Sequence, residues 1–536
     1  MAINSVLSDR VSPSLITNYS GVLLIMQRFV FWRSSRGKRL ASYVFIAIAV
    51  VVLTAISSWR SPALAVTPRH YTELEFAPPP EIQVPDYTRF ELDNGMTVFL
   101  LEDHELPLVS GSAMFRTGDR LEPGKKVGLA SITGEVIRSG GSEAHPADEL
   151  NQLLEQRAAS VETGTDISTG SASFSALSED LEDVFGLFAE VLRQPALPQD
   201  KIDLSKVQWR GSIARRNDDP GEVASREFQK LIYGAESPYA RTVEYATLDN
   251  VSRQDIVSFY RQYFRPENML LGIVGDFDPD AMRSLIEAQF GTWRPEPVSG
   301  FQTSLPEVTQ RTTGGVFLVD LPQLTQSYVQ VGHLGGQLNE PDYATLSVMN
   351  EALNGFGGRL VNEVRSRQGL AYVVYAFWSP RYDFPGTFVG GGQTRSDATV
   401  PFVQSILAEL EEVRTTPITE AELARAKESV LNAFIFNFQS PSQTLSRVMR
   451  YEYYDYPQDF IFQYQREVEA TTPEAIQQAA QTHLKPENIV TLVVGNAADI
   501  QPPLNTLVPD GQQVTTIDIT IPPPPSDASP EPGTGV

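Results

Sequence analysis

Residues 264–275 read FRPENMLLGIVG, and residues 484–495 read LKPENIVTLVVG, 220 positions later. Further elements recur in the same order at nearly the same offset: Val98 with Val316, Lys206 with Lys427 and Pro220 with Pro441. Solenoid repeats are far shorter than this. The chain is therefore predicted to hold two copies of one domain of roughly 200 residues. Two like domains commonly face each other across a cleft, which is the usual place for a ligand.

The composition is that of a globular protein, with 41% hydrophobic and 20% charged residues. The net charge of −24 argues against a nucleic-acid partner, because such proteins carry a positive footprint. The acidic exterior is either an ordinary solvated surface or part of a cavity that attracts basic peptides. The chain has no cysteine, which excludes disulfides, thiol catalysis and cysteine-based zinc sites.

The amino end carries a candidate targeting segment. Leu40–Trp59 is a run of 20 residues without a charge, long enough to span a bilayer. Residues 1–39 are basic, which predicts a cytoplasmic amino end and export of the rest of the chain. Ala63–Ala65 resembles a signal-peptidase site. Residues 40–65 are thus a signal peptide or a retained membrane anchor, and a buried core helix is the third alternative.

Composition divides the exported part into five segments. Residues 66–87 are proline-rich and indicate an extended linker. The first repeat is expected over 88–295 and the second over 314–500, with a joint at 296–313. Residues 501–536 contain many prolines and few apolar residues, and we expect them to be disordered.

Within the first repeat, the apolar periodicity predicts both strands and helices. Residues 90–101 alternate around Asp-Asn-Gly, which is a hairpin signal. Helical spacing follows over 128–141 until Gly140-Gly141, and again over about 179–193. Ser252 is expected to cap a helix through Tyr263, before a buried strand at 269–274. This mixture predicts an α+β domain.

Three pieces of the chain together resemble a known family. The hairpin at 90–101, the helix GLASITGEVIRSGG at 128–141 and RSRQGLAY at 365–372 occur in this order on the duplicated domain. The combination resembles the pitrilysin / mitochondrial processing peptidase family of inverse-zincin metallopeptidases, over about residues 85–500. The resemblance implies two homologous metallopeptidase-like α+β domains that face each other across a cleft, and a role in proteolysis.

Active members of that family hold zinc with His-x-x-Glu-His on the helix after the first hairpin, and the Glu is the general base. In this chain the box is missing. Aligned on Gly-Leu-Ala, the first ligand position is Ser131, the base position is Gly134 and the second ligand position is Glu135. The family's third ligand, a Glu on a later helix, falls at Gly211 or Ser212.

The loss of the box can be tested from the residues alone. The chain has five histidines, and none lies within four residues of another: His70, His104, His145, His333 and His483. No helix can therefore present two imidazoles to one metal. Ser131 and Glu135 share a helix face, but one hydroxyl and one carboxylate make a poor tetrahedral site. We expect a solvated or hydrogen-bonded pair there and no metal bound by this chain.

The second repeat retains the family's other signature. Arg365 and Tyr372 lie seven residues apart, with Gly369 breaking the helix between them. By resemblance, this pair reaches the scissile peptide, and a guanidinium and a phenol can stabilise the charge that develops on its carbonyl oxygen. Without that context they are a surface cation and a packed aromatic. Residues 354–358 (NGFGG) form either a flexible substrate-contacting loop or a plain turn.

The resemblance implies that the chain is the zinc-less subunit of a heterodimeric peptidase. A zinc-bearing partner would hold the metal, and this chain would supply Arg365 and Tyr372 to an unfolded peptide. One alternative is a non-enzymatic structural or peptide-binding subunit, like the core subunits of respiratory complexes. Another is an independent peptidase that uses Glu135 with a different metal.

Overall fold

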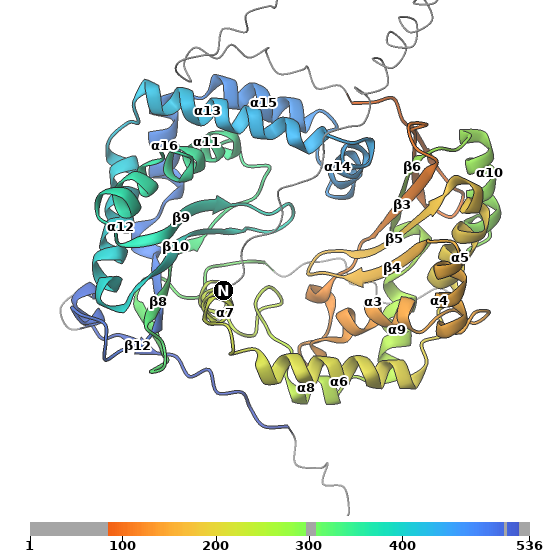
Figure 1. The fold of residues 1–536 in the computed structure, drawn as a ribbon, viewed down its shortest axis with the longest axis horizontal. Coiled ribbons are helices and arrows are strands. Elements are labelled where there is room, and N and C mark those ends of the chain that lie inside the picture. Colours follow the sequence, from red (N-terminus) through yellow and green to blue (C-terminus); the bar gives the residue numbers. More distant parts are fainter. Residues whose placement is uncertain (1–83, 296–306, 509–511, 525–536) are drawn as a thin grey trace, which may run out of the picture. The chain divides into compact units, whose positions relative to one another are not determined.

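The computed structural model describes residues 84–295, 307–508 and 512–524 (Figure 1). The amino end, the run at 40–59, most of the linker and residues 296–306 of the joint lie outside the described residues. None of the helices in the described part has both the length and the apolar character needed to cross a bilayer.

The first repeat builds a six-stranded sheet in the order β1-β2-β6-β3-β5-β4. Its strands are β1 (Thr88–Glu91), β2 (Thr97–Glu102), β3 (Leu108–Phe115), β4 (Ser160–Thr165), β5 (Gly170–Leu177) and β6 (Met269–Gly275). Its helices are α3 (Leu129–Ser139), α4 (Ala147–Gln156), α5 (Leu181–Arg193), α6 (Gln199–Arg215), α7 (Pro220–Tyr233), α8 (Tyr245–Asp249), α9 (Arg253–Tyr263) and α10 (Pro279–Phe290). The predicted hairpin, helices and buried strand are all present, and Ser252 caps α9.

The second repeat builds an equivalent sheet in the order β12-β7-β11-β8-β10-β9. Its strands are β7 (Val316–Asp320), β8 (Gln326–Leu334), β9 (Ala371–Ser379), β10 (Thr387–Arg395), β11 (Val490–Gly495) and β12 (Thr515–Thr516). Its helices are α11 (Tyr343–Asn354), α12 (Thr399–Thr415), α13 (Glu420–Ile435), α14 (Pro441–Tyr453), α15 (Phe460–Ala470) and α16 (Pro473–His483). The two sheets match strand by strand from β2 and β7 onward, so the prediction of two homologous α+β domains is confirmed.

The prediction of a disordered tail over 501–536 is wrong for residues 501–508 and 512–524. β12 pairs with β7, and the Ile517 amide donates to the Leu318 carbonyl at 2.8 Å. The described residues 307–315 form no strand in front of β7, and the tail covers the edge of β7 that this leaves open. Residues 525–536 lie outside the described residues.

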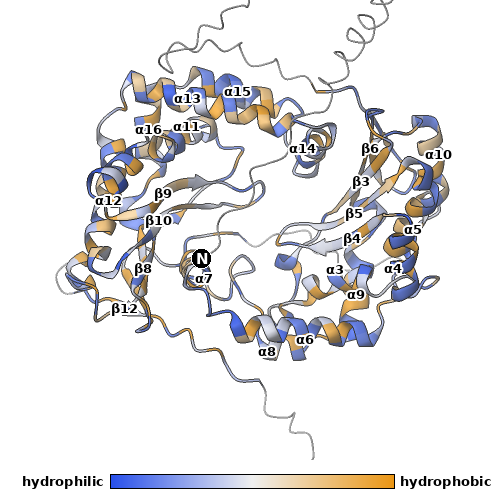
Figure 2. Ribbon diagram, viewed as in Figure 1, coloured by the Kyte–Doolittle hydropathy of each residue, from blue (hydrophilic) through white to orange (hydrophobic). Residues whose placement is uncertain are grey.

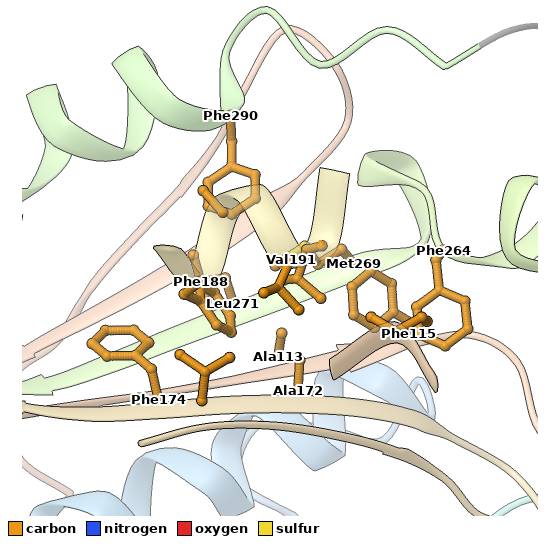
Figure 3. Close-up of a cluster of buried hydrophobic side chains, with 14 of the residues drawn as sticks. Ala113, Phe115, Ala172, Phe174, Phe188, Val191, Phe264, Met269, Leu271 and Phe290 are labelled. Atoms are coloured by element: carbon orange, nitrogen blue, oxygen red, sulfur yellow. The ribbon is translucent and has the colours of Figure 1, made fainter. Parts of the chain in front are cut away.

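Aromatic side chains fill the core of the first repeat (Figure 3). Phe174 on β5 lies 5.1 Å from Phe188 and 5.5 Å from Phe185 on α5, measured between ring centroids. Gly111 on β3 makes room for Phe174, because a Cβ at this position would collide with that ring. Figure 2 shows that hydrophobic and hydrophilic residues are interleaved along the helices, as expected for helices with one face on a core.

The two repeats exchange one helix each. Helix α7 of the first repeat packs Val223 and Phe228 against β8 and β11 of the second sheet. Helix α14 of the second repeat packs Leu445 and Met449 against β2 and β6 of the first sheet. Pro220 and Pro441, which the repeat pairs in sequence, are the first residues of these two helices. The exchange buries the middle of each sheet under a helix from the other repeat.

A loop at 380–386 adds further contacts between the repeats. Phe384 is buried, with its ring 4.5 Å from that of Tyr239. The Tyr233 hydroxyl donates to the Pro385 carbonyl at 2.9 Å, and Asp383 forms an ion pair with Arg120 at 2.5 Å. Apolar and polar contacts therefore both hold the repeats together.

Candidate functional site

Helix α3 carries the positions of the missing zinc box. Leu129, Ile132 and Val136 face the core at helical spacing. The helix begins after Gly128, whose φ of 102° is in the left-handed region. The Glu122 carboxylate accepts hydrogen bonds from the first amides, with Gly128 N at 3.0 Å and Ala130 N at 2.9 Å. An acidic residue thus caps the helix where the macrodipole is positive.

Ser131, at the first ligand position, donates a hydrogen bond to Asp119. Its Oγ lies 3.2 Å from Oδ1 and 3.3 Å from Oδ2 of that carboxylate. Burial, and next the nearby Glu122 carboxylate, raise the pKa of Asp119 to about 7. The Ser131 hydroxyl is therefore engaged as a hydrogen-bond donor to the largely buried carboxyl group of Asp119.

Glu135, at the second ligand position, is held by helix α6. Ser205 Oγ donates to Oε2 at 2.6 Å, and Trp209 Nε1 donates to Oε1 at 3.2 Å. Both oxygens of the carboxylate already have a donor. The expected Ser131–Glu135 pair is thus replaced by two separate pairs, one with Asp119 and one with α6.

Gly134, at the base position, lies directly against strand β4. A Cβ on this residue would stand 2.5 Å from Thr165 Oγ1 and 2.7 Å from the backbone carbonyl carbon of Gly164. Thr163 Oγ1 also donates to the Gly134 carbonyl at 2.6 Å. A side chain at the base position would collide with the strand, so a glutamate cannot stand here without moving β4.

The two candidates for the third ligand position lie near the end of α6 and do not join this cluster. Ser212 is exposed, and its Oγ donates to the Gln208 carbonyl of its own helix at 3.3 Å. A Cβ on Gly211 would meet nothing within 4 Å. The α6 residues that do reach Glu135 are Ser205 and Trp209, which sequence reasoning missed although their i, i+4 spacing places them on one face.

These residues do not fit a zinc ion. Ser131 offers a hydroxyl, Gly134 offers no side chain, and both Glu135 oxygens are engaged. Across the described residues, no group of three or more His, Cys, Asp or Glu side chains could hold a metal. A cavity of about 560 Å³ adjoins the cluster, and its lining includes Asp119, Ser131 and Trp209.

Arg365 and Tyr372 lie together on the second repeat. The Arg365 guanidinium carbon is 4.7 Å from the centre of the Tyr372 ring, within the range of a cation–π contact. The Tyr372 side chain is 78% exposed, and Arg365 is also exposed. Gly369, with φ of 63°, ends the π-helical segment Val361–Arg367 and turns the chain into β9. The predicted break at Gly369 is what brings the two side chains side by side.

The NGFGG segment joins α11 to the segment at 361–367. Phe356 projects fully into solvent, and Gly357 has a left-handed φ of 83°. The Asn354 side chain bonds both backbone groups of Ala376, at 2.6 and 2.7 Å, and so closes the outer edge of β9. The segment is therefore a turn that also presents an exposed aromatic ring.

A cavity of about 560 Å³, here called the inter-repeat cavity, is lined by residues of both repeats. The first repeat contributes β4, including Glu162, and the loop around Asp166. The second repeat contributes Arg381, Tyr382 and Arg450. Acidic and basic side chains thus both line a cavity whose volume is typical of ligand sites.

Comparisons with known proteins agree with this architecture. The model described as insulinase (peptidase family M16) matches residues 97–242, and the model described as peptidase M16 inactive domain matches residues 250–430. An uncharacterised zinc protease of Mycobacterium leprae is 30% identical over 288 residues, which are 52% of this chain and 62% of that protein. The match thus spans under two thirds of that relative.

Other relatives differ in their assigned activity. The non-peptidase homologue YmxG of Helicobacter pylori is 22% identical over 401 residues, which are 74% of this chain and 90% of that protein. A crystal structure of a peptidase M16 inactive domain from Pseudomonas fluorescens has a TM-score of 0.68 at 24% identity, covering 78% of this chain and 100% of that one. A Helicobacter pylori protease has a TM-score of 0.66 at 19% identity, covering 76% and 99%. The structural likeness shows a shared fold.

Proposed function

The chain belongs to the M16 family of peptidases, and on that premise we propose that it is the zinc-less subunit of a two-chain peptidase. A partner chain of the same family would bind the zinc. This chain would supply Arg365 and Tyr372, which donate hydrogen bonds to the scissile carbonyl oxygen of an unfolded peptide. The partner, the substrate and the division of labour are all parts of the proposal.

The contact between Arg365 and Tyr372 carries this proposal. Two exposed donors stand side by side, 4.7 Å from guanidinium carbon to ring centre. Such stacking holds a long arginine side chain in one orientation, and fixed donors stabilise a developing oxyanion more than mobile ones. In a purely structural pair, the tyrosine ring would be expected to be buried or the guanidinium to pair with a carboxylate.

The state of the zinc-box positions supports the assignment of the metal to another chain. Gly134 is pressed against β4, and Glu135 is held by Ser205 and Trp209. An independent peptidase built on Glu135 would have to break both of these hydrogen bonds. We therefore set that alternative aside.

The experiment is peptide hydrolysis by the chain mixed with each zinc-bearing M16 chain of the same organism. Assembly is measured by light scattering, and cleavage by a quenched fluorescent peptide library. In the active mixture, Tyr372→Phe removes one donor and is expected to lower kcat by about a hundredfold, since an oxyanion donor contributes roughly 3 kcal/mol. KM should change little, because the lost bond forms mainly in the transition state.

Tyr375→Phe is the matched control, because Tyr375 lies on the same strand and its ring stacks on that of Phe377, with centroids 6.0 Å apart. This variant should keep the unmodified rate. If Tyr372→Phe and Arg365→Ala both retain full turnover in an assembled pair, the proposal of a catalytic subunit is refuted.

A non-enzymatic peptide-binding subunit is the second candidate function. The inter-repeat cavity supports it, because that cavity lies within this one chain and needs no zinc. This alternative predicts that the chain alone binds unfolded peptides and that no M16 partner turns them over. Fluorescence anisotropy with labelled peptides, in the absence of any partner, distinguishes the two functions.

We also infer that the chain acts outside the cytoplasm, from the uncharged run Leu40–Trp59 and its basic flank. A reporter that is active only in the cytoplasm, fused after Val66, should be inactive. An active fusion would refute this location.

A further inference from the structure

A separate cavity of about 430 Å³ lies within the second repeat, here called the aromatic pocket. Its walls come from α11, α13, α14, α15 and β9. Its volume falls in the range of roughly 300–1,000 Å³ that is typical of small-molecule sites. It contains neither the zinc-box positions nor Arg365 and Tyr372.

Seven aromatic side chains line this pocket: Tyr343, Phe377, Tyr382, Phe434, Tyr451, Phe460 and Tyr464. Their rings also hold one another in place. Tyr464 lies 5.0 Å from Tyr343 and 5.6 Å from Phe434, and Tyr451 lies 5.3 Å from Phe460, between centroids. The walls are thus preformed, and ring faces and edges of this kind favour a flat apolar ring.

Among the described residues, Arg447 on α14 is the only cation that lines the pocket. Its Nη2 donates to Asn437 Oδ1 at 2.6 Å, and its Nη1 makes only a long contact of 3.5 Å with the Tyr451 hydroxyl. Its guanidinium carbon lies 5.6 Å from the Phe438 ring centre. No carboxylate of the described residues forms an ion pair with Arg447. Its charge is therefore met only by neutral groups.

The single carboxylate of the lining does not compensate this charge. Glu351 instead accepts a hydrogen bond from Ser429 Oγ at 2.7 Å. A half-buried guanidinium with neutral partners still has N–H groups to donate, because each Nη carries two and only one of them is engaged. It is suited to an anion, because charge-assisted hydrogen bonds are the strong ones.

We propose that the aromatic pocket binds an aromatic ring that carries a carboxylate. The ring enters between the tyrosine and phenylalanine side chains, and the carboxylate accepts hydrogen bonds from Arg447. Two sources share this chemistry: a free aromatic acid, and the carboxy-terminal aromatic residue of a peptide. Tyr382 lines both this pocket and the inter-repeat cavity, so a peptide end could reach it from there.

The first test compares two ligands of nearly equal shape, of which only one carries a charge. N-acetylphenylalanine and its amide are titrated into the full chain by isothermal calorimetry. The acid should bind at least about tenfold more tightly, since hydrogen bonds to charged groups are the stronger kind. Arg447→Gln should remove this preference. Arg466→Gln, an exposed arginine on α15 outside the pocket, should preserve it.

The second test fills the pocket. Ala433 lines it and Ala424 is an exposed alanine of the same helix outside the lining. Ala433→Trp should abolish binding of the acid, whereas Ala424→Trp should leave the dissociation constant within about twofold. Far-ultraviolet circular dichroism of both variants shows that each is folded.

Two tetrapeptides of equal composition separate the sources, one with phenylalanine at its carboxyl end and one with phenylalanine inside. Binding of only the first, as tight as that of the free acid, supports the proposal with a peptide as the source. Binding of the free acid but of neither peptide supports it with a small molecule as the source. Equal binding of acid and amide, no binding of either, or full binding to Ala433→Trp would overturn it.

Discussion

Replacing Gly134 by alanine tests the closest contact of the zinc-box helix. A Cβ at this position would stand 2.5 Å from Thr165 Oγ1 and 2.7 Å from Gly164 C, closer than real Cβ contacts. Overpacking of this kind costs about 1–3 kcal/mol. Alanine is about 1 kcal/mol better than glycine inside a helix. We therefore expect Gly134→Ala to be neutral or to lower the free energy of unfolding by up to about 2 kcal/mol.

Gly211 provides the matched control. It also lies inside a helix, but a Cβ there would meet nothing within 4 Å. Gly211→Ala should thus raise the free energy of unfolding by about 1 kcal/mol. Subtracting the change in unfolding free energy of one variant from that of the other cancels the contribution of helix propensity. The remainder, about 1–3 kcal/mol, is the cost of the collision with β4.

The assay is urea unfolding of both variants, monitored by tryptophan fluorescence and circular dichroism. The slope of the unfolding free energy against urea concentration is compared first, and the midpoints are compared second. If Gly134→Ala and Gly211→Ala stabilise the protein equally, the close approach of α3 to β4 is refuted. The argument that a glutamate has no room at the base position would then fail as well.

Three further outcomes are expected. The pKa of Asp119 is raised from 3.8 to about 7, so its protonated carboxyl stabilises the fold at low pH and this stabilisation is lost as pH rises through that range. Asp119→Asn lacks the titrating group. Its free energy of unfolding, measured in urea, should therefore rise relative to that of the unmodified chain between pH 4 and pH 8, by at most about 4 kcal/mol. Met449→Ala removes a buried side chain of α14 from the first sheet and should cost about 2–5 kcal/mol in the same assay, whereas a loss under 1 kcal/mol would contradict the packing. Deletion of residues 512–536 should expose the edge of β7 and cause self-association, detected by light scattering, and a monomer at all concentrations would contradict that role of β12.

Local patterns predicted most of the fold. The repeat at 264–275 and 484–495, the hairpin at 90–101 and the serine cap of α9 depend on short-range chemistry, and all three are present. The tail was mispredicted because its average composition hid a period-two pattern. Ile517, Ile519 and Ile521 alternate, as in a half-buried strand, and pack against the two repeats.

The candidate site was less predictable, because it depends on how elements cross. The loss of the zinc ligands could be read from Ser131 and Gly134 alone. That Trp209 reaches Glu135 follows from the packing of α6 on α3, and that Gly134 has no room follows from the distance to β4. Neither is encoded in the spacing of residues along the chain.

The exchange of α7 and α14 means that neither repeat is a self-sufficient folding unit. A chain ending at Pro295 would keep its own sheet but lose the helix that covers it, and would display the apolar side of α7 with nothing to pack on. The fragment that holds the second repeat would lose α7 from its sheet and would expose the apolar side of α14. Cleavage of the backbone at 296–306 should therefore yield fragments that remain bound and rebuild each other after separation, as the two halves of an interleaved dimer would.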